Sequence, residues 1–259
     1  MGGRGGVSHG GSAGGGAVRP RLMAAKAFLD NAYGKKHAQK ILEIIEKAPA
    51  GIREMWEKYG GMFRAGHLDP HSDQAYYSPY EHKVYLGIED VAAGDAIHTP
   101  YNTIFHEYGH MTDHLIGAAL GGGGFGTYSE FYEGGLLGDT AKSELRGHIS
   151  RMKSLHPDAT KKKEAAQYLI REIRQKYSSM LDTGDLSDML EGAGIGMSYP
   201  LGAGHGAFYW SNRDNGLEIF AEITAAEASS PGSLKAIREY FPKTYSVYQD
   251  MIEEWRKMK

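Results

Sequence analysis

Residues 99–118 read TPYNTIFHEYGHMTDHLIGA, and this stretch is predicted to form one helix. Thr99 is of a residue type that caps helix N-termini, and Pro100 suits the first helical position. An apolar stripe with helical spacing is formed by Ile104, Tyr108, Met111 and Leu115. We therefore expect the helix to pack through this stripe and to turn its histidines toward a different environment.

The same stretch contains the pattern H-E-x-x-H, formed by His106, Glu107 and His110. Residues four apart share a helix face, with Cβ atoms about 5–6 Å apart, so both imidazoles can reach one Zn²⁺ ion. Glu107 lies about 100° further round the helix, where it can take a proton from water held at the ion. The pattern predicts a hydrolytic zinc site. Gly109 lies in the middle of the helix, where glycine is unfavourable, so we expect another element to pack closely against the helix at this residue.

A zinc site of this kind needs a third protein ligand. Glu218, in the segment NGLEIFAEITAAE, is the preferred candidate. Glu222 lies one turn later on the same helix face, so one carboxylate can ligate while the other hydrogen-bonds a ligand imidazole. The alternative for this pair is a solvated acidic face, but the apolar residues between them favour a buried helix.

Other ligand choices are weaker. Glu130 lies 20 residues after His110, but no clear helix surrounds it. His114 lies one further turn along the first helix, and its direction is rotated round the helix axis away from that of His106 and His110. We therefore expect it to be either exposed or a neighbour of the ligands. The metzincin pattern requires Gly and His three and six residues past the motif, where this chain has Asp113 and Ile116.

The composition limits the remaining possibilities. The 259 residues carry a formal net charge of −3 and no dense stripe of Lys and Arg, which argues against a nucleic-acid partner. Without cysteine, a metal must be bound by His, Asp or Glu. No apolar run approaches the roughly 18 residues of a membrane helix, and the Gly-rich start, which has no apolar segment, is not expected to act as a secretory signal. We expect no membrane partner and a cytoplasmic or virion-associated protein.

Periodicity and turn residues predict an α+β fold, mainly helical with a small, mostly antiparallel sheet. Residues 1–20 are Gly-rich and expected to be a disordered tail, and residues 21–259 to form a single domain. Strands are predicted at 62–68 and 82–90, and an irregular loop over a site at 182–206. Helices are predicted at 22–34, 35–49, 51–61, 99–118, 160–181 and 215–229, followed by two more that are separated at Pro242.

Two distant segments, FHEYGHMTD and EIFAEI, together with YFPKTYSVYQDMI, resemble the catalytic domain of the anthrax lethal factor family, which includes the clostridial Pro-Pro endopeptidases. The resemblance covers about residues 85–255 and is specific at its two ends, while the middle does not align. The chain also resembles, more closely, metallopeptidase-like domains of phage minor head (head morphogenesis) proteins, in LSDML, GHGAFYW, YFPKTY and the GGRGG start.

The resemblance implies a zincin-like metallopeptidase with zinc bound by His106, His110 and Glu218. Glu107 would be the general base, and Glu222 would contact a ligand imidazole. In the family a tyrosine seven residues before the ligand glutamate stabilises the oxyanion, but here Ser211 stands there. Either Tyr209 or His205 would take that role.

A strand before the active-site helix runs along the substrate cleft in that family. Tyr76, Tyr77 and Tyr80 would line the cleft here, or belong to a hairpin that only packs on the sheet.

The first hypothesis is a zinc-dependent endopeptidase that acts on a protein or peptide substrate. The second is a catalytically silent, zinc-binding structural component of a phage head, with phage head proteins as partners. It is motivated by the phage-like segments and by Ser211. A helical scaffold without metal is the third.

Overall fold

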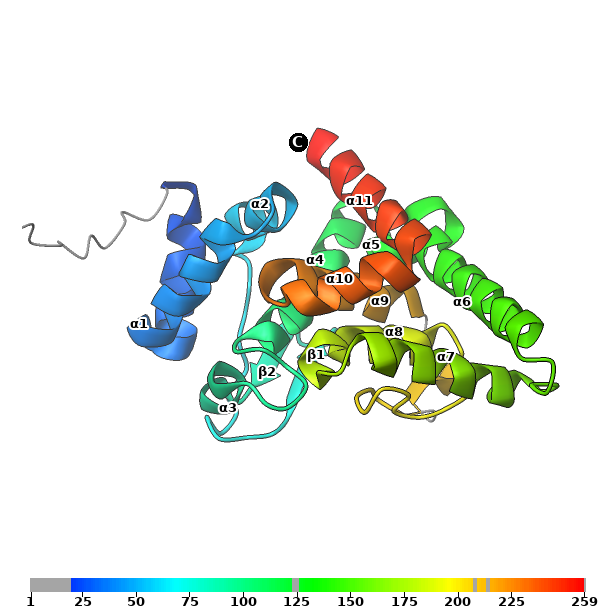
Figure 1. Ribbon diagram of the computed structural model, residues 1–259. Coiled ribbons are helices and arrows are strands. Elements are labelled where there is room, and N and C mark those ends of the chain that lie inside the picture. Colours follow the sequence, from blue (N-terminus) through cyan, green and yellow to red (C-terminus); the bar gives the residue numbers. More distant parts are fainter. Residues whose placement is uncertain (1–19, 123–125, 207–208, 213–214, 259) are drawn as a thin grey trace, which may run out of the picture.

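The computed structural model describes residues 20–122, 126–206, 209–212 and 215–258 (Figure 1). The predicted tail at 1–20 therefore lies outside the described residues, except for Pro20. The first element of the described chain is a short 3-10 helix, Pro20–Leu22.

Helices make up most of the described chain, as the sequence predicts. Among these residues, no helix combines the length and apolar character needed to cross a membrane. The α-helices are α1 (Met23–Lys47), α2 (Ala50–Tyr59), α3 (Ile88–Ala93), α4 (Asn102–Ala119), α5 (Tyr128–Phe131), α6 (Leu136–Leu155), α7 (Lys162–Lys176), α8 (Gly184–Gly192), α9 (Asn215–Ser229), α10 (Pro231–Tyr240) and α11 (Pro242–Lys257).

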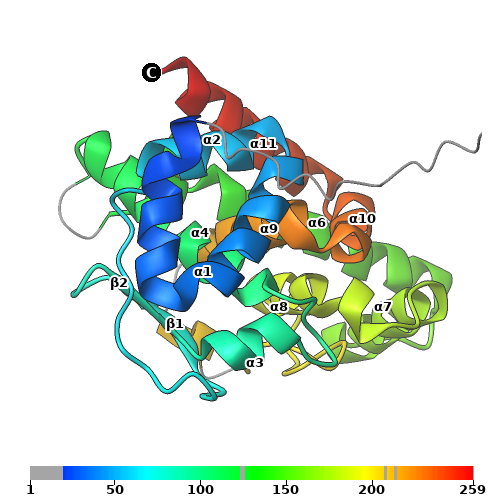
Figure 2. The same cartoon turned by 90° about the vertical axis from the view of Figure 1, so that its left-hand side faces the viewer.

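Helix α9 occupies the middle of the molecule (Figures 1 and 2). It contacts α1, α2, α4, α5, α6, α8, α10 and α11. Almost its whole circumference is buried, because the segment IFAEITAA offers apolar and small residues on every side. The polar residues that α9 does carry, including Glu218 and Glu222, are consequently buried as well.

The sheet is a single antiparallel pair, β1 (Ala75–Ser78) with β2 (Lys83–Leu86), in which Tyr76 pairs with Tyr85. The predicted small antiparallel sheet is confirmed. The strand predicted at 62–68 is wrong, because this segment contributes only an isolated bridge between Ala65 and Val84. The hairpin packs on α4, which both of its strands contact.

Most predicted breaks between helices are confirmed. Helix α1 is interrupted at Gly34, whose φ of 79° is left-handed. Helix α2 starts after Pro49, and Pro242 begins α11.

The prediction of an irregular loop at 182–206 is wrong in its first part, because residues Gly184–Gly192 form helix α8. Its polar residues are buried rather than solvated, which periodicity alone does not reveal. Helix α6 was not predicted, and the helix predicted at 160–181 is shorter, since α7 ends at Lys176.

The start of α4 also differs from the prediction. Thr99 does not cap it, because the helix begins at Asn102 after Tyr101, which is in the left-handed conformation. The Thr99 hydroxyl instead donates to the Ser229 carbonyl at 3.2 Å, and the Asn102 side chain donates to the Ser230 hydroxyl at 2.9 Å. These bonds attach the beginning of α4 to the end of α9, so the two helices run antiparallel.

Gly109 lies where α4 and α9 approach each other closely. A Cβ atom at this position would lie 3.2 Å from the Ala221 Cα and 3.4 Å from the Thr224 Cβ. The close packing expected of this mid-helix glycine is confirmed.

We predict that Gly109→Ala destabilises the protein although alanine favours helices. The gain in helix propensity, about 1 kcal/mol, is opposed by overpacking against α9, which typically costs about 1–3 kcal/mol. Gly147, exposed in the middle of α6, is the matched control, because a Cβ added there would have open space for 4 Å around it. Gly147→Ala should stabilise by about 0.5–1 kcal/mol in urea unfolding. Equal stabilisation by both substitutions would contradict close packing at Gly109.

Candidate metal centre

The antiparallel pairing of α4 and α9 brings His106, His110 and Glu218 together. The two imidazole Nε2 atoms lie 3.1 Å apart. The Glu218 Oε2 atom is 3.5 Å from His106 Nε2 and 3.3 Å from His110 Nε2. Three potential ligand atoms from two helices, more than 100 residues apart in sequence, thus converge on one point.

The triangle has the dimensions of a zinc site. Ligand atoms 2.0–2.1 Å from a tetrahedral Zn²⁺ ion are about 3.3–3.4 Å from one another. The observed edges of 3.1, 3.3 and 3.5 Å lie around this value. Two neutral imidazoles and one carboxylate also form a donor set typical of catalytic zinc sites. The residues present therefore fit a zinc ion.

Carboxylates around the imidazoles favour positive charge at this point. Burial alone would lower the pKa of His106, but the carboxylates of Glu222 and Glu218 raise it well above its usual range. Burial would likewise raise the pKa of Glu218, yet His110, His106 and His205 hold it well below its usual range. The field that favours an imidazolium here would also stabilise a divalent cation.

Glu222 lies behind His106. Its Oε1 atom is 3.3 Å from His106 Nδ1, on the side of the ring away from the ligand triangle. A carboxylate in this position orients a ligand imidazole and increases its basicity. The Nδ1 atom of His110 is buried and has no hydrogen-bond partner within the described part of the chain.

Glu107 is a buried carboxylate that lines a cavity. Its side chain is only 6% exposed, and it has neither a hydrogen bond nor an ion pair with any described residue. A buried carboxylate without a partner is costly unless water or a ligand satisfies it. Because His106 lines the same cavity, Glu107 can meet a molecule located at the ligand triangle.

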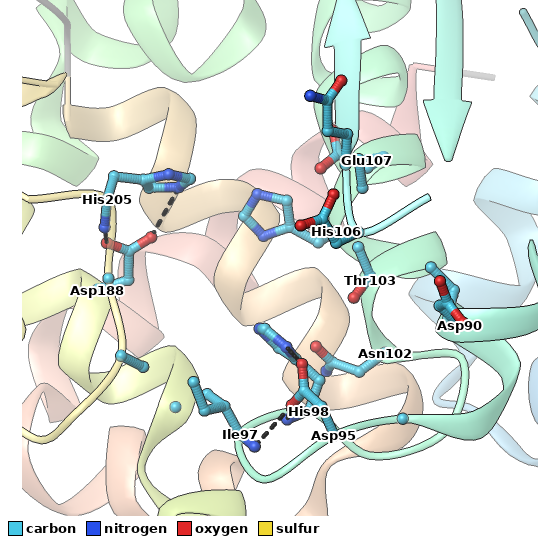
Figure 3. A pocket seen from close by; sticks show the side chains of 18 of the residues that line it. Asp90, Asp95, Ile97, His98, Asn102, Thr103, His106, Glu107, Asp188 and His205 are labelled. Carbon is cyan, nitrogen blue, oxygen red and sulfur yellow. Dashed lines mark hydrogen bonds and ion pairs between the residues drawn. The ribbon is translucent and has the colours of Figure 1, made fainter. Parts of the chain in front are cut away.

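His205 approaches the triangle from the loop after α8 (Figure 3). Its Nε2 atom is 3.0 Å from Asp188 Oδ2 and 3.6 Å from Glu218 Oε2. Burial would lower the pKa of this imidazole, but the bonds and charges of Asp188 and Glu218 raise it to about 10. His205 therefore presents a positive charge at neutral pH.

Tyr209 stacks on His205, with ring centroids 4.0 Å apart, and its hydroxyl donates a hydrogen bond to Glu218 Oε1. Both residues predicted as oxyanion donors thus lie next to the Glu218 carboxylate. Of the two, His205 is the one among the residues that line the cavity. The side chain of Ser211 lies outside what the structure describes.

Helix α8 holds the loop that carries these donors. Asp188 accepts a bond from the His205 amide at 3.2 Å, and Glu191 accepts from the Gly206 amide at 2.8 Å and from the Trp210 indole at 3.1 Å. The Ser187 hydroxyl donates to the Ala203 carbonyl at 2.7 Å.

The role of these α8 residues was not predicted from the sequence. The run LSDMLEG could have indicated a helix, because Ser187, Asp188 and Glu191 alternate in it with apolar residues at helical spacing.

Two weaker ligand candidates lie elsewhere. The Glu130 carboxylate accepts bonds from the Thr127 amide and hydroxyl at the start of α5. His114 is buried rather than exposed, and its Nδ1 atom lies 2.7 Å from the Tyr77 hydroxyl on β1.

The cavity in front of the triangle has a volume of about 610 Å³, within the range of ligand sites. Helix α4 contributes His106 and Glu107, and the α8 side contributes Asp188 and His205. Figure 3 shows His106 between the pair Asp188–His205 on one side and Asp90 on the other. A molecule in the cavity can therefore touch His106, which is the member of the triangle that lines it, and the residues around it.

Comparison with known proteins gives no match to the chain among protein-family models, curated proteins or solved structures. The chemistry of the site thus rests on its own residues. It combines a three-ligand cluster, a buried carboxylate without a partner among the described residues and a cationic donor beside one cavity.

Asp113, one turn after His110, is a second buried acid on α4. It accepts a bond from the Ser129 amide at 2.8 Å and another from the Ser129 hydroxyl. Burial raises its pKa to about 7, although the bonds from Ser129 oppose the rise.

We predict that Asp113 makes the protein less stable as pH rises. Its pKa is about 7 when folded and about 3.9 in an unfolded chain, so between these values the folded state binds the extra proton. Stability from this group is therefore full below pH 4 and declines up to about pH 7. Asp113→Asn should remove this decline, measured as the urea midpoint at pH 5 and pH 8.

The difference between wild type and Asp113→Asn isolates Asp113, because the histidines titrate in both. Asp139→Asn, an exposed acid of α6, is the control. Parallel pH profiles for wild type and Asp113→Asn would contradict the raised pKa.

Proposed function

We propose that this protein is a zinc-dependent endopeptidase of the zincin-like type. The observation that carries the proposal is the triangle of His106, His110 and Glu218, with the Glu107 carboxylate, unpartnered among the described residues, beside it. The mainly helical fold, with its small antiparallel hairpin packed on α4, agrees with this class. The substrate would be a protein or peptide that enters the 610 Å³ cavity.

His106, His110 and Glu218 would hold the zinc ion. When bound, the ion would lower the pKa of water to about 7 and polarise the scissile carbonyl. Glu107 would accept the proton from the attacking water and transfer it to the leaving amine. Its burial and its lack of any partner among the described residues leave both oxygens available for this task.

His205 is the better candidate for stabilising negative charge on the carbonyl oxygen. It lines the cavity, and Asp188 and Glu218 keep it cationic. Tyr209 acts through its bond to Glu218 and its stacking on His205, so in this proposal it is a positioning residue.

We predict that Glu107→Gln retains one equivalent of zinc and loses peptide cleavage by about 10²–10⁴-fold, because the amide cannot accept the proton. Glu218→Gln should lose both zinc and activity, because it removes the charged ligand. Zinc would be measured by mass spectrometry and cleavage with a fluorogenic peptide library. Undiminished cleavage by Glu107→Gln, or full zinc occupancy in Glu218→Gln, would overturn these roles.

We predict a larger loss for His205→Gln than for Tyr209→Phe. Removing a donor to the oxyanion typically lowers kcat by about 10²–10³-fold, whereas a positioning bond contributes less. KM should change little in either variant, since both contacts matter in the transition state. Steady-state kinetics at saturating zinc measure kcat and KM separately for each variant. A greater kcat loss in Tyr209→Phe would reverse the two assignments.

A second candidate function is a catalytically silent zinc site in a structural component of a phage head. The observation that favours it is that Tyr209 bonds to Glu218 instead of lining the cavity. Zinc would then link α4 to the central helix α9, and it would stabilise the folded state because it binds that state and not the unfolded chain. Phage head proteins would be its partners. One equivalent of zinc, destabilisation by a chelator and no cleavage of peptides or phage head proteins would select this function.

A further inference from the structure

A second cavity, with a volume of about 380 Å³, lies between α7 and the loop that follows α8. The more buried of its lining residues are apolar: Ile170, Met197 and Pro200. Its exposed lining residues include Arg171 and Arg174, which lie one turn apart on α7. Among the described residues, no acid lines this cavity, which we call the arginine groove. Its charge therefore suits an anionic ligand.

The charges of these two arginines are not neutralised within the described chain. Neither Arg171 nor Arg174 forms an ion pair with a described residue, and their printed partners are a backbone carbonyl each. Both acids of α7 are engaged elsewhere, since Glu164 accepts a backbone bond at the start of the helix and Glu172 pairs with Arg151 at 2.7 Å. The groove thus keeps two positive charges for a ligand.

Contacts with neighbouring residues position both guanidinium groups. Arg171 lies over the ring of Tyr168, 4.2 Å from its centroid, and Arg174 donates to the Pro200 carbonyl at 3.3 Å. Asp158 accepts a bond from the Tyr168 hydroxyl at 2.6 Å instead of pairing with Arg171. A guanidinium group has five N–H donors in a planar fork that matches a carboxylate. Groups that are already positioned lose less entropy when they bind a ligand.

Tyr199 connects the arginine groove with the cavity beside the ligand triangle, because it lines both. Its φ of 51° is left-handed, which is uncommon for a tyrosine, and its amide donates to the Glu191 carboxylate. A Cβ atom at Gly206 would lie 3.0 Å from the Tyr199 hydroxyl, so this hydroxyl lies beside the residue that follows His205. A peptide in the first cavity can therefore continue over Tyr199 into the arginine groove.

We propose that the arginine groove binds a carboxylate of the peptide substrate at a distance from the scissile bond. The carboxylate would belong to an aspartate or glutamate side chain or to the C-terminus of the peptide. This inference rests on the proposed peptidase function. Charge complementarity supports it, because two positioned guanidinium groups beside an apolar floor can form charge-assisted hydrogen bonds to a carboxylate.

Pairs of peptides that differ by one charge test the inference. Peptides with a neutral background, a neutral fluorophore and an amidated C-terminus carry one glutamate at successive positions, and matched peptides carry glutamine. A third pair without glutamate compares a free with an amidated C-terminus, which separates the two sources of the carboxylate. Binding to zinc-loaded Glu107→Gln protein is measured by fluorescence anisotropy. At the best position, the carboxylate should bind about tenfold more tightly than its amide.

The preference should disappear in Arg171→Gln/Arg174→Gln and weaken at high salt, which screens charges. Arg171→Lys/Arg174→Lys keeps both charges but not the planar forks, and it should retain part of the preference. The control Arg146→Gln/Lys163→Gln removes the same charge from exposed positions outside both cavities and should leave the preference unchanged.

Three results would overturn the inference. They are equal binding of the carboxylate and the amide in every pair, absence of binding by all the peptides, and a preference that survives in the double glutamine variant.

Cleavage by zinc-loaded wild type distinguishes these results from a failure of the proposed function. The carboxylate should lower KM and leave kcat nearly unchanged, because the groove is away from the scissile bond. Cleavage with the same KM for both members of every pair would keep the peptidase and overturn the groove. A preference in binding that depends on Arg171 and Arg174, without any cleavage, would support the groove and overturn the peptidase.

Discussion

The contact between α4 and α9 determines the arrangement of the site. Because the helices run antiparallel, a step of one turn along α4 from His106 to His110 meets a reverse step along α9 from Glu222 to Glu218. The absence of a side chain at Gly109 permits the close approach. One helix pair thus supplies both imidazoles, the third ligand atom and the carboxylate behind His106.

The contact between α4 and α9 buries an unusual number of ionisable groups. Glu218 is 1% exposed and Glu222 is 6% exposed, in a helix that is otherwise apolar. Carboxylates in such a place destabilise a fold unless they are paired or take up a proton, and burial raises the pKa of Glu222 well above its usual range. The acids and imidazoles at the contact are a costly way to pack α4 on α9, and they form a group that could hold a metal ion.

The sequence predicts the parts of this site that follow local rules. The spacing of His106, Glu107 and His110 depends only on helix geometry, and the apolar segment around Glu218 indicates a buried helix. The position of Tyr209 and His205 beside Glu218 depends on a loop whose path is set by tertiary contacts. The buried acids of α8 are the clearest example, because Asp188 and Glu191 look like surface residues until the loop covers them. Thr99 fails as a cap for the same reason, since Ser229 and Ser230 compete for its hydroxyl.

The site therefore combines two kinds of support. The three potential ligand atoms come from two packed helices, where burial restricts each side chain. His205 and Tyr209 come from a loop that α8 holds through single side chains, chiefly Asp188 and Glu191. A change in α8 can move the donors without moving the ligands, whereas a change at the α4–α9 contact moves both. The triangle of His106, His110 and Glu218 and the loop group His205 are thus held by different elements, although Glu107 shares α4 with the two histidines of the triangle.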